Sequence, residues 1–109
     1  MSKDVTTQSY QNLNSKNFQE KLSSNPAAIL LDVRTEAEFE AEHIPSSVNL
    51  NVMDASFIDK IAALDKSKTY FVYCRSGGRS GSACSIMVNQ GYDVYHLAGG
   101  ISNWTGEVC

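Results

Sequence analysis

Residues 69–90 read TYFVYCRSGGRSGSACSIMVNQ and join a predicted strand to a predicted helix. The run from Thr69 to Tyr73 combines β-branched and aromatic side chains without polar alternation, which indicates a strand buried on both faces. A helix is predicted from about Ser80 to Gln90, with apolar side chains on one side and Gly91 as its stop. The segment therefore predicts a strand, a glycine-containing turn and a helix in direct succession.

The rest of the chain repeats this alternation of short apolar runs and amphipathic segments. Four further strands are predicted, at residues 10–13, 29–33, 48–50 and 93–97. Helices are predicted after a cap at Ser15, after a capping box from Thr35 to Glu38 and after a cap at Asp54, with a terminal helical turn at 101–104. Strands of this kind, separated by helices, predict an α/β fold with a five-stranded parallel sheet covered on both faces. Ligands in such folds bind where strands end and helices begin.

Length and composition restrict the class of protein. The 109 residues are enough for one domain and too few for two, so we expect a single domain over residues 1–109. A net charge of −3 argues against nucleic acid or an anionic membrane as partner. The polar start, Met1 to Tyr10, has no signal-peptide pattern, and the longest aliphatic run, Ala27 to Leu31, is too short to span a bilayer. We therefore expect a cytoplasmic protein with free thiols.

Cys74 stands where the predicted strand turns toward the helix, at the start of a candidate anion-binding loop, Cys74 to Ser80. Gly77 and Gly78 can take positive φ, which lets consecutive backbone N–H groups point into one concavity. The helix N-terminus adds partial positive charge at the same place. Because a thiolate is stabilised in such a cradle, its pKa can fall to roughly 3.5–7.5. The pattern indicates a nucleophilic cysteine.

The distribution of charge around the loop supports this interpretation. Between Thr69 and Tyr92 the only charged residues are Arg75 and Arg79, in a chain that is acidic as a whole. The spacing suggests that Arg79, five positions after the cysteine, closes the loop and grips an anion with its planar guanidinium. The alternative is a buried structural cysteine before a glycine-rich turn, which needs neither arginine.

Short motifs follow one another along the chain in a recognisable order. They are Leu31-Asp32-Val33-Arg34, Glu38-Phe39, His43-Ile44-Pro45, Asn49-Leu50, the loop Cys74 to Ser80, and Leu97-Ala98-Gly99-Gly100 before Trp104. In order and spacing, residues 9–106 or so resemble the rhodanese family of sulfurtransferases. The resemblance implies a rhodanese-like three-layer fold. Where the family often has Gly-His-Ile-Pro-Gly-Ala, this chain has Glu42-His43-Ile44-Pro45-Ser46-Ser47, so we expect an altered surface turn there.

The resemblance also implies a reaction cycle. The Cys74 thiolate would attack the sulfane sulfur of a donor such as thiosulfate or a polysulfide, which leaves a persulfide on Cys74. A thiol or cyanide acceptor would then take that sulfur, and a thiol on another protein is one such acceptor. The cycle needs a nucleophile of low pKa, N–H donors around the persulfide and a cation for an anionic donor. It needs no organic cofactor.

The loop and the resemblance together define the expected site. Cys74 is expected to be catalytic. The expected substrate-binding residues are the rest of the loop: Arg75, Ser76, Gly77, Gly78, Arg79 and Ser80. Asp32 and Arg34 are expected to support the loop and its neighbouring turns, with a direct catalytic role as the alternative. His43 and His96 are expected to be structural, with general-base work by His43 as the alternative.

The other two cysteines are expected to stay outside the chemistry. Cys84 falls on the predicted helix beside Ala83 and Met87, which indicates a buried and inert thiol. Cys109, at the end of the sequence, is expected to be mobile. The three cysteines and two histidines have no metal-ligand spacing, so no metal site is predicted.

Three functions follow from these features. The first is a sulfurtransferase. The second is a rhodanese-like module without activity that binds a partner or senses sulfide, although such a module has no need of the cysteine, both glycines and Arg79. The third is a phosphatase or arsenate reductase, since cell-cycle dual-specificity phosphatases share the fold. Their loop places the arginine six positions after the cysteine, where this chain has Ser80. Loop length therefore favours sulfur transfer.

Overall fold

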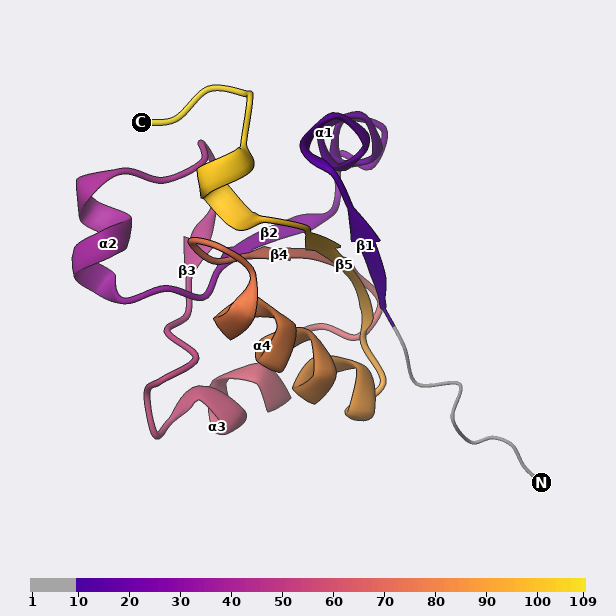
Figure 1. Cartoon of the computed structure of the whole chain (residues 1–109). Coiled ribbons are helices and arrows are strands. Elements are labelled where there is room, and N and C mark those ends of the chain that lie inside the picture. The colour runs from indigo at the N-terminus through magenta and orange to yellow at the C-terminus, as the bar shows by residue number, and fades with distance from the viewer. Residues whose placement is uncertain (1–9) are drawn as a thin grey trace.

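The chain folds around one sheet of five parallel strands (Figure 1). The computed structural model describes residues 10–109, so the predicted features of residues 1–9 lie outside the described residues. The strands are β1 (Gln11–Leu13), β2 (Ile29–Asp32), β3 (Val48–Asn49), β4 (Thr69–Tyr73) and β5 (Asp93–Leu97), in the order β1-β5-β4-β2-β3. The helices are α1 (Ser15–Ser23), α2 (Glu36–Ala41), α3 (Phe57–Ala62), α4 (Gly78–Asn89) and the 3₁₀ helix η2 (Gly100–Asn103).

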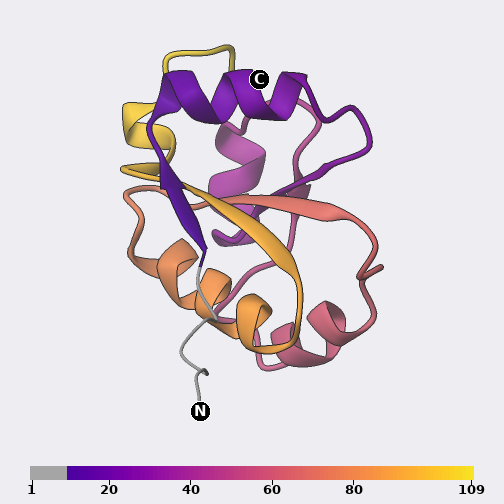
Figure 2. The same cartoon turned by 90° about the vertical axis from the view of Figure 1, so that its right-hand side faces the viewer.

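Helices cover both faces of the sheet. Figures 1 and 2 show α3 and α4 on one side of the strands and α1 on the other. One buried cluster includes Ile61 of α3 and Met87 of α4, and the second includes Phe18 of α1 with Trp104 packed against it. The strands supply both clusters because successive side chains point to opposite faces. The predicted α/β fold with a parallel sheet between helical layers is confirmed.

The topology creates a crevice at the carboxyl ends of two central strands. β2 and β4 are neighbours, yet the chain leaves β2 toward β3 at the edge and leaves β4 toward β5 on the other side. In open α/β sheets, ligands bind at the point where successive connections part in this way. Cys74 directly follows β4 and Arg34 lies just beyond β2, so both belong to this crevice.

Three predicted helix starts shift by a few residues. The cap of α1 is Asn14, whose side chain accepts from the Asn17 N–H, and Ser15 is the first helical residue. Asp54 accepts from the Ser56 N–H instead of capping a helix directly, which delays α3 to Phe57. The third shift is in α4, which starts at Gly78 rather than at Ser80. The capping box from Thr35 to Glu38 is confirmed by both of its hydrogen bonds.

The turn that departs from the family pattern keeps a left-handed backbone. Ser46 has φ of +71°, a conformation that glycine adopts at much lower cost. Glu42 is extended, with φ of −171°, and needs no glycine. The turn therefore differs from the family pattern in one respect: a strained serine, Ser46, stands where the family often has glycine.

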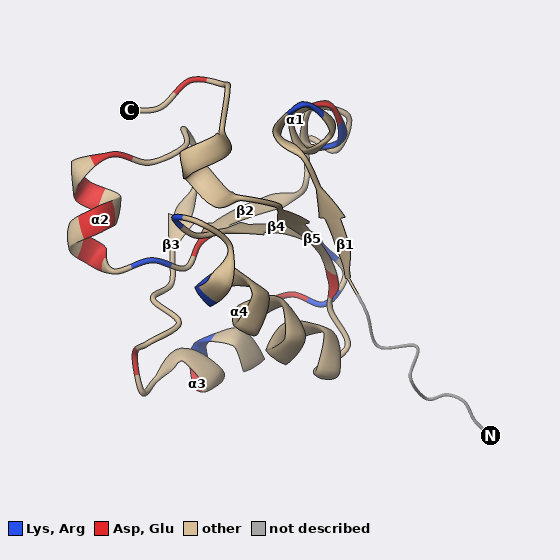
Figure 3. Cartoon of the chain, viewed as in Figure 1, with Lys and Arg blue, Asp and Glu red and all other residues tan. Residues whose placement is uncertain are grey.

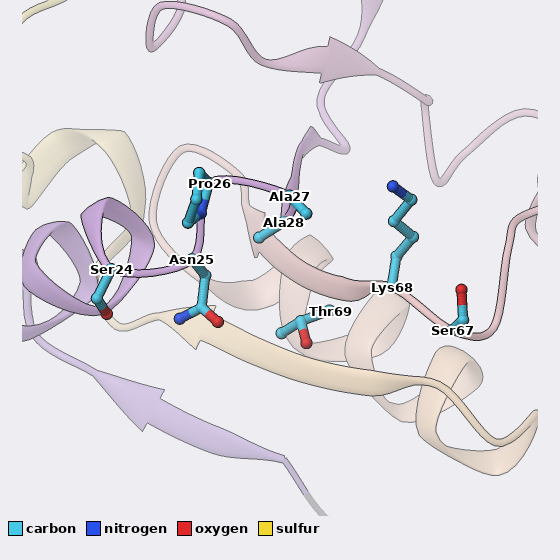
Figure 4. A pocket seen from close by; sticks show the side chains of 8 residues that line it. All are labelled: Ser24, Asn25, Pro26, Ala27, Ala28, Ser67, Lys68 and Thr69. Atoms are coloured by element: carbon cyan, nitrogen blue, oxygen red, sulfur yellow. The ribbon is translucent and has the colours of Figure 1, made fainter.

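Two further features lie away from the crevice. A hollow lined by residues 24–28 and 67–69 opens beside the starts of β2 and β4 (Figure 4). Cys74 follows the other end of β4, so the hollow and the thiol lie at opposite ends of the strands. Within residues 10–109, none of the helices has the length and apolar character needed to cross a membrane.

Candidate active site

The Cys74 thiol lies in a cradle formed by the turn between β4 and α4. The Gly77 N–H donates to Cys74 Sγ at 3.0 Å, and the Ser80 hydroxyl donates to the same sulfur at 3.2 Å. Gly77 has φ of +114° and directly precedes α4, so the positive end of that helix faces the sulfur. Gly78, for which positive φ was predicted, is instead the first residue of the helix. The cradle thus depends on one left-handed glycine.

These contacts determine the acidity of the thiol. Cys74 is 1% exposed, and burial alone would raise its pKa. Hydrogen bonds from the Ser80 hydroxyl and from the backbone N–H groups of Ser80, Gly77 and Ser76 favour the thiolate and outweigh that effect. The pKa of Cys74 is therefore lowered from the ordinary value of a thiol. Cys84 shows the contrast, because burial and the nearby Cys74 charge raise its pKa to about 12.

The start of the loop is held from outside by η2. The Ile101 N–H donates to the Cys74 carbonyl at 2.9 Å, and the Ser102 N–H donates to the Arg75 carbonyl at 3.0 Å. Gly100 allows this close approach, since a Cβ there would lie 2.4 Å from the Arg75 oxygen and 2.5 Å from the Cys74 oxygen. Because η2 binds the carbonyls of Cys74 and Arg75, the backbone N–H groups that follow in the loop face the Cys74 sulfur. The Gly99-Gly100 motif therefore belongs to the site.

Arg79 is already paired with a carboxylate. Its two terminal nitrogens donate to the Glu38 oxygens at 2.6 and 3.0 Å, and Arg75 Nε lies 3.3 Å from Glu38 Oε2. The Arg79 guanidinium, followed by a smaller effect of Thr35, lowers the pKa of Glu38 well below its usual range. Figure 3 shows the acidic residues on α2 and the basic residue at the start of α4. The Arg79 guanidinium, which the sequence predicts to bind an anionic donor, is thus paired with the Glu38 carboxylate of the protein itself.

Asp32 and Arg34 form a buried ion pair beside the loop. Arg34 Nη2 donates to Asp32 Oδ2 at 2.6 Å, and the two side chains are 3% and 0% exposed. The same Nη2 donates to the Glu42 carbonyl at 2.6 Å, at the end of α2. Asn49 donates to the carbonyls of both residues of the pair. The pair ties β2, β3 and α2 together, and a supporting role for it stays a prediction.

The sequence interpretation gave His96 only a structural role, but the structure brings its imidazole into the site. His96 Nε2 lies 2.5 Å from Ser80 Oγ, the hydroxyl that contacts Cys74, and His96 Nδ1 lies 2.6 Å from Asn12 Oδ1. The residue is buried on the last strand, and burial lowers its pKa. One signal pointed this way: a polar ring near the carboxyl end of an apolar strand next to β4. Asn12 had no such signal.

The remaining sulfur and imidazole groups lie elsewhere. His43 Nδ1 donates to the Phe39 carbonyl at 2.8 Å, and the imidazole stacks on the Phe39 ring, which agrees with a structural role. Two backbone hydrogen bonds pair His43 with Cys109, so Cys109 lies beside the end of α2, and its expected mobility stays a prediction. Among residues 10–109, no three His, Cys, Asp or Glu side chains gather as metal ligands would.

Comparison with known proteins identifies the family of this chain. The family model described as the rhodanese-like domain matches residues 14–107. The chain belongs to the rhodanese-like family.

Relatives of this rhodanese-like chain carry related names. It is 42% identical over 78 residues to the thiosulfate sulfurtransferase GlpE of Pseudomonas savastanoi pv. phaseolicola, a match that covers 71% of this chain and 72% of that protein. A protein named sulfurtransferase from Allochromatium vinosum is 32% identical over 93 residues, covering 84% and 85% of the two chains. The crystal structure of a rhodanese-related protein from Thermoplasma volcanium superposes with a TM-score of 0.81 at 27% identity, over 92% of this chain and 98% of that one.

Proposed function

We propose that this chain is a sulfurtransferase that carries one sulfane sulfur atom as a persulfide on Cys74. The observation that supports it best is the cradle around Cys74 Sγ, where the Gly77 N–H and the Ser80 hydroxyl donate to the sulfur. Such donors stabilise a thiolate before the reaction and the terminal sulfur of a persulfide after it. The relatives that bear sulfurtransferase names support the same class of reaction.

The proposed reaction has two displacements at sulfur. In the first, the Cys74 thiolate attacks the sulfane sulfur of the donor, a new S–S bond forms, and the donor's own bond to that sulfur breaks. With thiosulfate the leaving group is sulfite. In the second, a thiolate or cyanide attacks the outer sulfur of the persulfide, and the Cys74 thiolate leaves. Both steps are favoured by the lowered pKa of Cys74, because a thiolate is the nucleophile in one and the leaving group in the other.

The choice of donor depends on the clasp formed by Glu38, Arg79 and Arg75. An anionic donor needs the guanidinium groups, and Glu38 holds both of them. Thiosulfate must therefore compete with a carboxylate, whereas a neutral polysulfide does not. We propose that both donors are used and that Glu38 disfavours the anionic one.

Loop length favours sulfur over phosphate as substrate. The position six residues after Cys74, where the related phosphatases have their arginine, is occupied by Ser80. Its hydroxyl contacts Cys74 Sγ and His96 and is completely buried. A serine in that place closes the cradle and puts no cation at the position where those phosphatases have theirs.

Three cysteine variants test the proposal. Cys74→Ser should abolish thiosulfate:cyanide sulfur transfer, since a hydroxyl cannot hold a persulfide. Cys84→Ser and Cys109→Ser are the matched controls and should turn over sulfur in reducing buffer. Circular dichroism confirms that each variant is folded. Sulfur transfer by folded Cys74→Ser at more than a trace of the parent rate would show that Cys74 is not the carrier.

A further inference from the structure

A continuous row of polar contacts leads from the nucleophile to the edge of the sheet. Ser80 Oγ lies 3.2 Å from Cys74 Sγ and 2.5 Å from His96 Nε2, and His96 Nδ1 lies 2.6 Å from Asn12 Oδ1. The row joins the loop, α4, β5 and β1, which are four separate elements of the fold. Sulfur transfer as proposed above uses Ser80 only as a donor and makes no use of the imidazole.

The number of protons in this row restricts its states. Asn12 Oδ1 is an acceptor, so His96 Nδ1 keeps its proton, and Nε2 of the neutral ring is an acceptor as well. Ser80 has a single hydroxyl proton. When that proton points to Nε2, the hydroxyl oxygen can accept from a Cys74 thiol. When it points to the sulfur, as a thiolate requires, Nε2 must donate and the ring is an imidazolium.

We propose that His96 is a positioning residue that takes up the proton of Cys74 through the Ser80 hydroxyl, with Asn12 holding the ring. The S–H bond of Cys74 and the original O–H bond of Ser80 break, while a new O–H bond forms on Ser80 and an N–H bond forms at Nε2. The products are a thiolate and an imidazolium separated by one hydroxyl group. The inference rests on the proposed function only in taking Cys74 as the nucleophile.

The surroundings of the ring suit this role. His96 is 5% exposed, and burial lowers its pKa, so the resting ring is neutral and its Nε2 can accept a hydrogen bond. Burial also disfavours the imidazolium, so the charged ring needs an anion close by to stabilise it. The Tyr10 ring meets the imidazole edge-on at 5.5 Å and is the titratable group that faces it from the segment before β1. From α4 the one charged side chain is Arg79, which is turned to Glu38.

From β4, Tyr70 shares the α4 face of the sheet, and its hydroxyl donates to the Asp65 carbonyl. Cys84 of α4 stays a neutral thiol because its pKa is raised to about 12. The partner of opposite charge for an imidazolium at His96 is therefore the Cys74 thiolate.

The experiment measures both members of the pair in the full chain without any sulfur donor. The ultraviolet absorption of the thiolate, with Cys74→Ser subtracted as blank, gives the pKa of Cys74. Nitrogen chemical shifts of the imidazole give the pKa of His96. His96→Gln should raise the pKa of Cys74 by about one pH unit, since an amide can donate to Ser80 but cannot take a proton. Cys74→Ser should lower the pKa of His96 by the same amount, because coupling between two sites is reciprocal.

Two further variants sharpen the test. Ser80→Ala removes the bridge and should raise the pKa of Cys74 at least as much as His96→Gln does. Asn12→Asp keeps the shape of the contact and adds a carboxylate, so it should raise the pKa of His96 and lower that of Cys74. It also decides the question if His96→Gln does not fold.

An unchanged pKa of Cys74 in folded His96→Gln, or in Asn12→Asp, would overturn the proposal and leave the imidazole a structural group. Because the titration uses no donor, this result is independent of the proposed function. Linked pKa values of Cys74 and His96 in a protein that forms no persulfide would refute only the proposed sulfur transfer. Persulfide formation in a protein whose Cys74 and His96 titrate independently would refute only the proposed role of His96.

Discussion

Glu38→Gln is the substitution that should change the donor preference most. Glutamine keeps the size of the side chain and can still serve in the capping box with Thr35. It removes the charge that holds Arg79 at 2.6 and 3.0 Å and Arg75 at 3.3 Å. Both guanidinium groups then become available to an anionic donor.

The size of the effect follows from the charges at the loop. A donor anion on Arg79 would lie roughly 6 Å from the displaced carboxylate, and two unit charges at that distance repel by about 3 kcal/mol at an effective dielectric constant of about 20. The side chains of Arg79 and Glu38 are 29% and 18% exposed, so solvent and salt reduce the repulsion to about half. Since about 1.4 kcal/mol corresponds to tenfold, kcat/KM for thiosulfate should rise about tenfold relative to that for a neutral organic polysulfide.

The assay compares steady-state rates with the two donors at low and high salt. Glu40→Gln is the matched control, since it removes an exposed charge from the same helix and should leave the ratio of the two donors nearly unchanged. The gain in Glu38→Gln should shrink at high salt. An equal change with both donors, or a fall with thiosulfate alone, would refute the view that Glu38 competes with the donor for Arg79.

Three other predictions concern the loop and the turn. Gly100→Ala should slow persulfide formation by on the order of a hundredfold, because its Cβ would displace the Cys74 carbonyl and the loop with it. Gly91→Ala is the control: Gly91 has φ of +94° and open space around it, so this variant should lose stability but keep the rate. Ser46→Gly should raise the free energy of unfolding by about 0.5–1 kcal/mol, as measured by chemical denaturation, because φ of +71° suits glycine; no gain would mean that the serine is not strained. The rate of persulfide formation should rise with pH through the lowered pKa of Cys74 and reach half of its maximum at a pH below the ordinary pKa of a thiol. A half-maximum at or above that ordinary value would mean an unperturbed thiol.

The fold and the place of Cys74 in it could be predicted because both follow from local patterns in the sequence. The apolar run from Thr69 to Tyr73, the glycine turn and the following helix need no distant information, and neither does the capping box at Thr35. The switch of strand order then places the end of β4 at the crevice. Local signals thus located Cys74 correctly at a strand-to-helix junction.

The partners of the loop could not be predicted, because each comes from a distant segment. Glu38 is 41 residues before Arg79, and its role as a capping residue already gave the carboxylate a local explanation. His96 meets Ser80 only because β5 lies beside β4 in the sheet. Helix boundaries shifted by a few residues where a neighbouring side chain satisfied the same backbone groups, as Asn14 does before Ser15.

A mass spectrum of the native protein after treatment with thiosulfate, and separately with a polysulfide, tests the central claim most directly. The account predicts a gain of the mass of one sulfur atom, located on Cys74 by fragmentation and removed by cyanide. Cys84→Ser and Cys109→Ser should show the same gain, and Cys74→Ser should show none. A protein that stays unmodified with both donors, or one that carries the extra sulfur on Cys109 instead, would contradict it.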